Sequence, residues 1–158
     1  MPATIIEQDA VYCLARFENL CIVIWRGEPT LDRVIRCEKV FRSIEGSVGF
    51  LAFVEDGCPI PNAATRKRSA EQLHEFRDRV RVQAAVIEGD GIFVSLSRTA
   101  IRGIFALTRS AALIGGSLNE IIGPLSSAMG MSSTELQTAV RSLRESYDKG
   151  AFAKKKAG

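Results

Sequence analysis

Short apolar runs that alternate with helix-like stretches are the feature that most constrains this chain. Residues 48–54 and 82–87 are continuous runs rich in Val, Phe and Ala, which is typical of strands buried on both faces of a sheet. Stretches with apolar residues at helical spacing precede, separate and follow these runs. Strands that alternate with helices pair in parallel through crossover connections, so the pattern predicts an α/β fold.

An antiparallel hairpin is predicted near the N-terminus. Residues 11–18 and 20–25 form two β-rich runs that are separated by little more than Asn19. A short last strand is expected at 111–114, which gives the order β-β-α-β-α-β-α-β-α-α. The predicted fold class is α/β, in which a mixed sheet begins with this hairpin, continues with parallel βα units and is followed by extra C-terminal helices.

Capping residues and helical periodicity predict where the helices begin. Thr30 and either Asn62 or Thr65 are the expected caps of the first two helices. The third helix is expected over residues 92–109. Two more helices are predicted by the capping boxes that Ser117 and Ser132 open, because Glu follows each of them three residues later.

Composition excludes several classes of protein. A chain of 158 residues with 46% apolar and 25% charged residues suits one globular domain. No apolar stretch is long enough for a transmembrane segment, and the acidic N-terminus lacks the positive start of a secretory signal, so a cytoplasmic location is expected. Basic and acidic residues are interleaved and aromatic residues are few, which speaks against nucleic acid as a partner.

Cofactor and metal sites are not expected. The four cysteines form no CxxC pair and there is one histidine, so neither a zinc site nor another metal site is predicted. The corner Glu88-Gly89-Asp90-Gly91 begins like a dinucleotide loop, but Val94 stands where the third glycine is needed. We interpret these glycines as a tight strand-to-helix corner and expect no cofactor. No nucleophile or pair of carboxylates stands out as a catalytic set, so the chain is expected not to be an enzyme.

Three stretches resemble bacterial STAS-like proteins, a fold of sulphate transporters and anti-sigma antagonists that is similar to CRAL-TRIO lipid carriers. The stretches are GEPTLDRV, VGFLAFVEDGCPIPNAATRKRSAEQL and VQAAVIEGDGIFVSLSRTAIRGIFAL, and the resemblance covers residues 11–128. Residues 131–148 are predicted as a helical extension by the capping box of Ser132, and residues 149–158 are predicted as a disordered basic tail because they lack a periodic pattern. The resemblance implies a STAS-like domain over residues 1–130. It also implies a non-enzymatic regulatory module that binds another protein in a cytoplasmic bacterial pathway.

The segment 56–69 is the predicted docking site for that partner. In anti-sigma antagonists, phosphorylation at a helix start switches partner binding, and the resemblance places this position at Thr65. A run of basic residues follows Thr65, and a solvated basic face is the alternative interpretation of that run. The partner-binding or regulatory candidates are Asp56, Thr65, Arg66, Lys67, Arg68 and Ser69.

The third helix carries more apolar surface than one buried face requires. Either the C-terminal helix pair packs over it, or the helix forms a homodimer through Ile101, Ile104 and Phe105. A rival function follows from the same surface, namely a carrier that binds a lipid or a small apolar anion beneath this helix.

Overall fold

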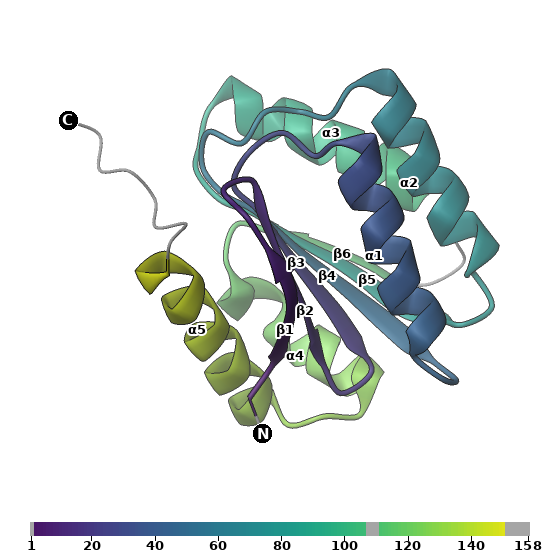
Figure 1. Ribbon diagram of the computed structural model, residues 1–158, viewed down its shortest axis with the longest axis vertical. Coiled ribbons are helices and arrows are strands. Elements are labelled where there is room, and N and C mark those ends of the chain that lie inside the picture. The colour runs from purple at the N-terminus through teal and green to yellow at the C-terminus, as the bar shows by residue number, and fades with distance from the viewer. Residues whose placement is uncertain (1, 107–110, 151–158) are drawn as a thin grey trace.

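A six-stranded mixed sheet lies between two layers of helices (Figure 1). The computed structural model describes residues 2–106 and 111–150. The strands run in the order β1-β2-β3-β4-β5-β6 across the sheet. Their bounds are β1 Thr4–Gln8, β2 Tyr12–Phe17, β3 Leu20–Trp25, β4 Val48–Val54, β5 Val80–Ile87 and β6 Ala111–Gly115. The helices are α1 Leu31–Ser43, α2 Ala63–Glu75, α3 Ile92–Phe105, α4 Leu118–Met129 and α5 Ser133–Lys149.

The predicted fold class is confirmed. Strands β2 and β3 form the antiparallel hairpin, and β3, β4, β5 and β6 pair in parallel. The strand β1, which the sequence pattern did not predict, adds a further antiparallel strand beside β2. It lies at the edge of the sheet, where Ile6 is exposed and no continuous apolar run marks the strand.

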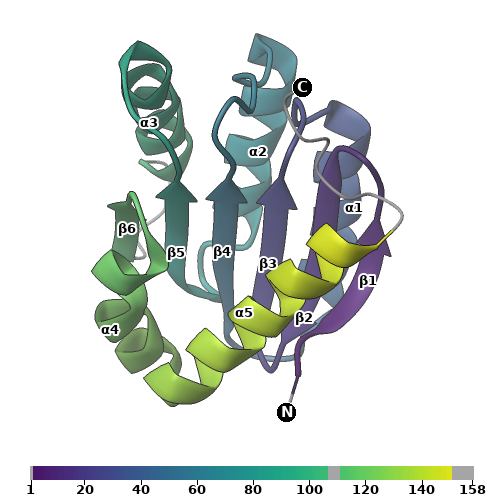
Figure 2. The same ribbon diagram turned by 90° about the vertical axis from the view of Figure 1, so that its left-hand side faces the viewer.

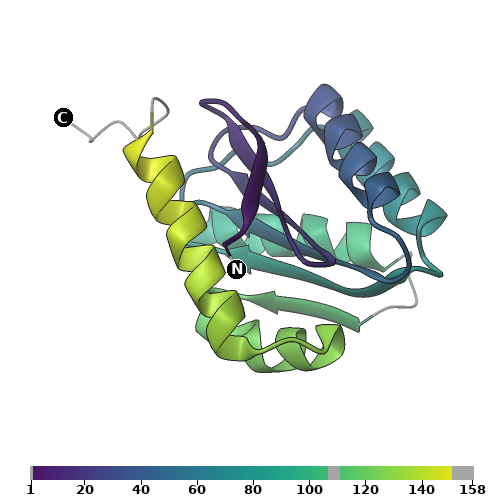
Figure 3. The same ribbon diagram turned by 60° about the horizontal axis from the view of Figure 1, so that its bottom comes forward.

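Helices α1, α2 and α3 cover one face of the sheet, and α4 and α5 cover the other (Figures 2 and 3). Each of the first three helices connects two neighbouring parallel strands, and the connections all step across the sheet in the same direction. Crossovers of the usual right-handed kind that step in one direction place their helices on the same face. The opposite face is therefore left for α4 and α5.

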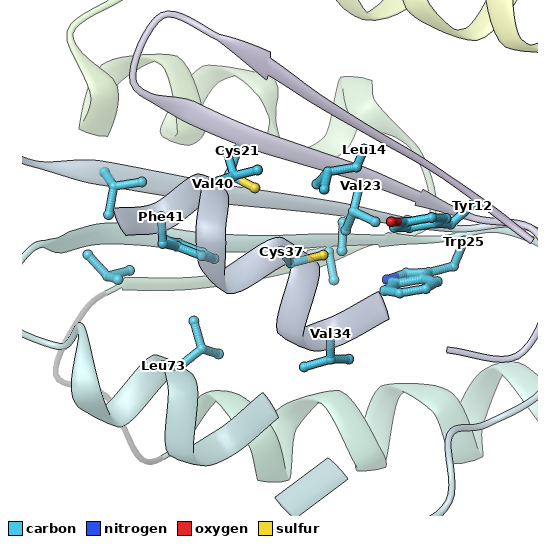
Figure 4. Packing of buried hydrophobic residues seen from close by; sticks show 14 of the residues in the cluster. Tyr12, Leu14, Cys21, Val23, Trp25, Val34, Cys37, Val40, Phe41 and Leu73 are labelled. Atoms are coloured by element: carbon cyan, nitrogen blue, oxygen red, sulfur yellow. The ribbon is translucent and has the colours of Figure 1, made fainter. Parts of the chain in front are cut away.

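The core beneath α1 and α2 is built on aromatic contacts (Figure 4). The rings of Tyr12 and Trp25 stack at a centroid distance of 5.3 Å, and those of Phe41 and Phe76 stack at 5.7 Å. Stacked pairs of this kind stabilise a core by about 0.5–1.5 kcal/mol beyond the area they bury. The first stack joins β2 to β3, and the second joins α1 to the end of α2. The ring of Phe41 also lies 5.6 Å from that of Phe50 and so joins α1 to β4.

The C-terminal helices complete a second core on the other face. Leu125 of α4 and Leu136 of α5 are fully buried against Ile22 and Phe53 of the sheet. The interpretation that this helix pair packs over the third helix is therefore wrong, because α4 and α5 lie across the sheet from α3. The predicted tail lies, except for residues 149 and 150, outside the described residues.

Most of the predicted helix starts are confirmed by their caps. Thr30 accepts from the Arg33 N–H, Asn62 accepts from the Thr65 N–H, and Ser132 accepts from the Glu135 N–H. The open choice for α2 thus falls on Asn62. The helix α4 begins after Ser117 as predicted, but the Ser117 side chain makes no cap bond, and Glu120 accepts from the Gly116 N–H instead. The predicted end of the third helix at residue 109 lies outside the described residues.

Candidate functional site

A cavity of about 100 Å³ lies between the sheet and the layer of α1, α2 and α3. It is close to the carboxyl ends of β3 and β4, where Trp25 and Val54 form part of its wall. The carboxyl ends of parallel strands are the usual place for a ligand in an open α/β sheet. Its apolar wall is completed by Val34, Cys37, Phe41, Phe50, Ala52, Cys58, Leu73, Ala85, Ala100, Ile101, Ile104 and Phe105, together with Pro29 and residues 59–61.

Two alanines on neighbouring strands leave this space open. Ala52 of β4 pairs in register with Ala85 of β5, and both side chains line the cavity. A methyl group at each position reaches less far toward the helices than the Val or Phe side chains elsewhere in these strands. At the far end of α3, the Gln83 amide donates to the Phe105 carbonyl over 3.0 Å and ties the helix to the sheet.

The groups that line the cavity carry no charge at neutral pH. Its polar side chains are those of Ser69, Gln72 and Ser97. Burial raises the pKa of the Cys37 thiol to about 12, and burial also raises the pKa of the Cys58 thiol to about 12. Both thiols therefore stay protonated and are poor nucleophiles.

The loop after β4 closes one side of the cavity. The Cys58 thiol donates to the Gly27 carbonyl over 3.2 Å, and an N–H of the Arg66 guanidinium donates to the Pro61 carbonyl over 2.9 Å. These bonds hold the loop between the end of β3 and the first turn of α2. The cavity wall and the predicted docking segment 56–69 are thus partly the same piece of chain.

A network of ion pairs lies at the same edge of the sheet. Arg26, Glu55 and Glu88 each follow a parallel strand, and Arg144 and Asp148 reach them from α5. The Arg26 Nε atom lies 2.6 Å from Oε1 of Glu55, and both side chains are more than nine-tenths buried. Each of the three carboxylates has a guanidinium partner, which makes them weak candidates for a general base.

Aromatic contacts strengthen this network. The Arg26 guanidinium lies 4.0 Å above the ring of Tyr147, whose hydroxyl donates to the Asp9 carbonyl over 2.8 Å. The hydrogen bond that Arg26 donates to Glu55 is the main reason that the pKa of Arg26 is raised. The network fastens the end of α5 to the edge of the sheet, beside the cavity.

The glycine corner before α3 has the geometry that a tight turn requires. Gly89 and Gly91 have φ values of 94° and 89°, in the region that side chains disfavour. A Cβ atom at Gly89 would collide with the carboxylate of Asp56. The glycines therefore serve backbone geometry, as the interpretation of a strand-to-helix corner required.

The predicted docking residues differ in how far they are exposed to solvent. Asp56 and Lys67 are exposed, whereas Arg66, Arg68 and Ser69 are half-buried. Arg68 is paired with Glu38 of α1, and Ser69 donates to the Thr65 carbonyl and lines the cavity. The Thr65 side chain is 1% exposed, so in this conformation its hydroxyl is closed to a kinase.

The predicted self-association residues line the cavity. Ile101 and Ile104 are half-buried, and Phe105 is 5% exposed. The large apolar side chains that α3 does expose are Ile92, Phe93 and Leu96, near its first turns. Homodimerisation through α3 stays a prediction.

The sequence reasoning missed four residues that define the cavity. They are Ala52, Gln72, Ala85 and Ser97. Gln72 gave no signal in the sequence because it is one of many polar residues in α2. The two alanines did give a signal in the sequence. Small side chains at neighbouring positions of two buried strands leave a gap in the core unless larger side chains of the covering helices fill it.

The described residues hold neither a membrane-spanning helix nor a cluster of metal ligands. Among residues 2–106 and 111–150, no helix has the length and apolar character needed to cross a membrane. Within the same ranges, no three His, Cys, Asp or Glu side chains are grouped so as to hold a metal ion. Comparison of the chain with models of protein families, with curated proteins and with solved structures finds no match.

Proposed function

We propose that the protein binds a small apolar ligand in the cavity beneath α1, α2 and α3. The observation that carries this proposal is an apolar space of about 100 Å³ at the carboxyl ends of the parallel strands. Core packing normally leaves few voids larger than a water molecule. An apolar space of this size therefore favours an occupant that stabilises the fold when it binds.

The size of the cavity limits the ligand. An apolar cavity of about 150 Å³ holds a benzene molecule. A space of about 100 Å³ suits a branched chain or a small ring and is too small for a whole acyl chain. The rival function inferred from the sequence, a carrier beneath the third helix, is thus supported in a narrower form, with a small ligand in place of a lipid.

The surroundings of the cavity favour binding of a ligand without its chemical conversion. The thiols of Cys37 and Cys58 are held protonated, so they are weak nucleophiles. The buried carboxylate of Glu55, which follows β4, is paired with Arg26 and Arg144. We therefore propose a binding protein, in which ligand occupancy is the signal or the cargo.

Xenon is a suitable first probe because it enters apolar cavities without needing a polar partner. The experiment records methyl NMR spectra of the protein under xenon pressure. We expect selective shifts of the cavity methyls of Val34, Leu73 and Ile104, with unchanged methyls for Leu125 and Leu136 on the opposite face. Absence of selective shifts at the cavity methyls would remove the proposed function.

The natural ligand is sought in protein that is purified from its native source. Native mass spectrometry of wild type and of Ala85→Val is compared, because Ala85 lines the cavity. We expect a small molecule that the wild type retains and the variant releases. Ala84→Val is the matched control, because Ala84 is equally buried but lies in the core of the opposite face.

Docking of a partner protein on segment 56–69 is the second candidate function. The observation in its favour is that residues 58–61 form part of the cavity wall and lead directly into the first turn of α2. Ligand binding would therefore alter the positions of the exposed side chains of Asp56 and Lys67. A regulatory module whose partner senses the ligand is the combined form of the two proposals.

The docking proposal is tested by neutralising the basic run. The triple variant Arg66→Gln, Lys67→Gln, Arg68→Gln is expected to lose capture of the partner in a pull-down, with and without the cavity ligand. Lys149→Gln is the control, because this exposed lysine lies at the end of α5. Equal capture by the triple variant and the wild type, with circular dichroism unchanged, would count against docking at this segment.

A further inference from the structure

We infer that the ligand of the cavity carries a neutral hydrogen-bonding group that Gln72 and Ser97 recognise. This inference rests on the proposed function and names the chemical class of the ligand. Gln72 of α2 is 4% exposed and Ser97 of α3 is 8% exposed, and both line the cavity. They belong to two different helices, so a ligand between the helices can meet both.

Neither side chain has a partner in the protein. In residues 2–106 and 111–150, no hydrogen bond engages the amide of Gln72 or the hydroxyl of Ser97. The polar atoms of both side chains are not among the fully enclosed atoms without a partner in the described residues, so a small molecule in the cavity can reach them. In a cavity with walls that are otherwise mostly apolar, two such groups mark the place where a ligand supplies the missing hydrogen bonds.

The chemistry of these two side chains defines what they bind. The Gln72 amide offers an N–H donor and a carbonyl acceptor, and the Ser97 hydroxyl both donates and accepts. Their best complement is a group that also donates and accepts, such as a primary amide or an alcohol. Ser69 adds a hydroxyl oxygen that can accept, because its own proton is directed to the Thr65 carbonyl over 3.0 Å.

A charged ligand group does not fit inside the cavity. No Asp, Glu, His, Lys or Arg side chain of the described residues lines it, and the thiols of Cys37 and Cys58 are protonated. A carboxylate that entered would lose its hydration without gaining a counter-charge, which is strongly unfavourable. A neutral group on a branched or cyclic apolar body is therefore preferred to the apolar anion expected from the sequence.

Isobutyramide and isobutyrate form a matched pair of probes. They have the same branched body and nearly the same shape, and they differ in the charge of the terminal group. Both are titrated into the wild-type protein, and binding is followed at the methyls of Leu73 and Ile104 and at the side-chain amide of Gln72. We expect isobutyramide to bind at least about tenfold more tightly, which corresponds to about 1.4 kcal/mol.

Variants test whether the two polar side chains supply this preference. Gln72→Leu and Ser97→Ala are each expected to weaken isobutyramide binding by about tenfold, because each removes one buried hydrogen bond to the ligand. If Gln72→Leu does not fold, Ser97→Ala still decides the question. Ser127→Ala is the control, because Ser127 is exposed on α4, on the other face of the sheet.

The outcomes separate this inference from the proposed function. Selective xenon shifts together with equal binding of isobutyramide and isobutyrate would overturn the inference and leave the proposed function standing. Unchanged isobutyramide affinity in both variants would also overturn it. Absence of xenon shifts and of binding by either probe would remove both proposals.

Discussion

Filling the cavity from the sheet side should stabilise the protein. The substitution Ala85→Val adds two methyl groups at a position that lines a space of about 100 Å³. Burial of one methylene-sized group stabilises by about 0.8 kcal/mol, which gives an upper value of about 1.6 kcal/mol for two. Loss of cavity volume acts in the same direction, at about 24 cal/mol per Å³, and small adjustments of neighbouring side chains act against it. We expect a net gain of about 1 kcal/mol in the free energy of unfolding.

The assay is urea denaturation, followed by circular dichroism, with thermal unfolding as a second measure. For a chain of this length, 1 kcal/mol corresponds to a rise in Tm of about 2–4 °C. Ligand must first be removed by unfolding and refolding on a column, because a retained ligand stabilises the wild type alone. The substituted residue stays within a strand, where a β-branched side chain is well tolerated.

Ala84→Val is the control that makes the result decisive. Ala84 precedes Ala85 in β5, is equally buried and belongs to the core beneath α4 and α5. Because that core is filled, the same two methyl groups should overpack it and destabilise the protein by about 1–3 kcal/mol. A loss of similar size in both variants would refute the reasoning, since it would mean that no space exists in front of Ala85.

Three more predictions concern packing and charge elsewhere in the fold. Arg26→Met should lower the free energy of unfolding by about 3 kcal/mol in urea denaturation, because it leaves the buried Glu55 with an incomplete set of partners, whereas Lys149→Met should change it little. Gly49→Ala should be destabilising by about 1–3 kcal/mol in thermal unfolding, because its Cβ atom would collide with Met129 and lie 2.9 Å from Cδ1 of Leu20, and Gly103→Ala, which has open space at an exposed position of α3, should be neutral or stabilising. Burial raises the pKa of Glu38, but hydrogen bonds from Arg42 and Arg68 outweigh it and lower the pKa below its usual 4.5, so Glu38 stabilises the fold above that pH. The stability difference between wild type and Glu38→Gln in urea should therefore be largest near neutral pH and shrink as the pH falls below 4.5; a difference that grows with acid would contradict this assignment.

The order of strands and helices could be predicted because it depends on local patterns. Continuous apolar runs marked β3, β4 and β5, and polar caps such as Thr30 and Ser132 marked helix starts. The edge strand β1 gave no such pattern, because none of its side chains is fully buried and its pairing with β2 shifts register between Ile5 and Glu7. Edge strands are formed by their neighbour more than by their own residues.

The side of the sheet on which each helix packs could not be predicted from the same patterns. An amphipathic sequence shows which face of a helix is buried, but it does not show against which surface. For this reason the sequence offers α4 and α5 as helices that could pack on α3, although they lie on the other face of the sheet. For the same reason it predicts Ile101 and Ile104 at a dimer interface, although they line the cavity.

The candidate site was only partly predictable for a related reason. The broad apolar surface of the third helix predicted a binding site beneath it. The volume of the cavity, however, depends on which side chains of β4 and β5 face α3. Gln72 and Ser97 come from two helices and meet the same space only in the folded chain. Polar residues at helix positions are ordinary in sequence, and burial makes these two exceptional.

The position of α5 has a consequence for how the chain is made. The hydroxyl of Tyr147 reaches the carbonyl of Asp9 across 138 positions of sequence, and Leu136 and Leu143 cover strands completed long before. During synthesis, the part of this face that α5 covers stays uncovered until α5 has left the ribosome, because α4 packs on β5 and β6. In that interval the nascent chain exposes apolar surface that chaperones can bind. A stop codon that removed α5 would leave this surface uncovered, and the product would be prone to aggregate.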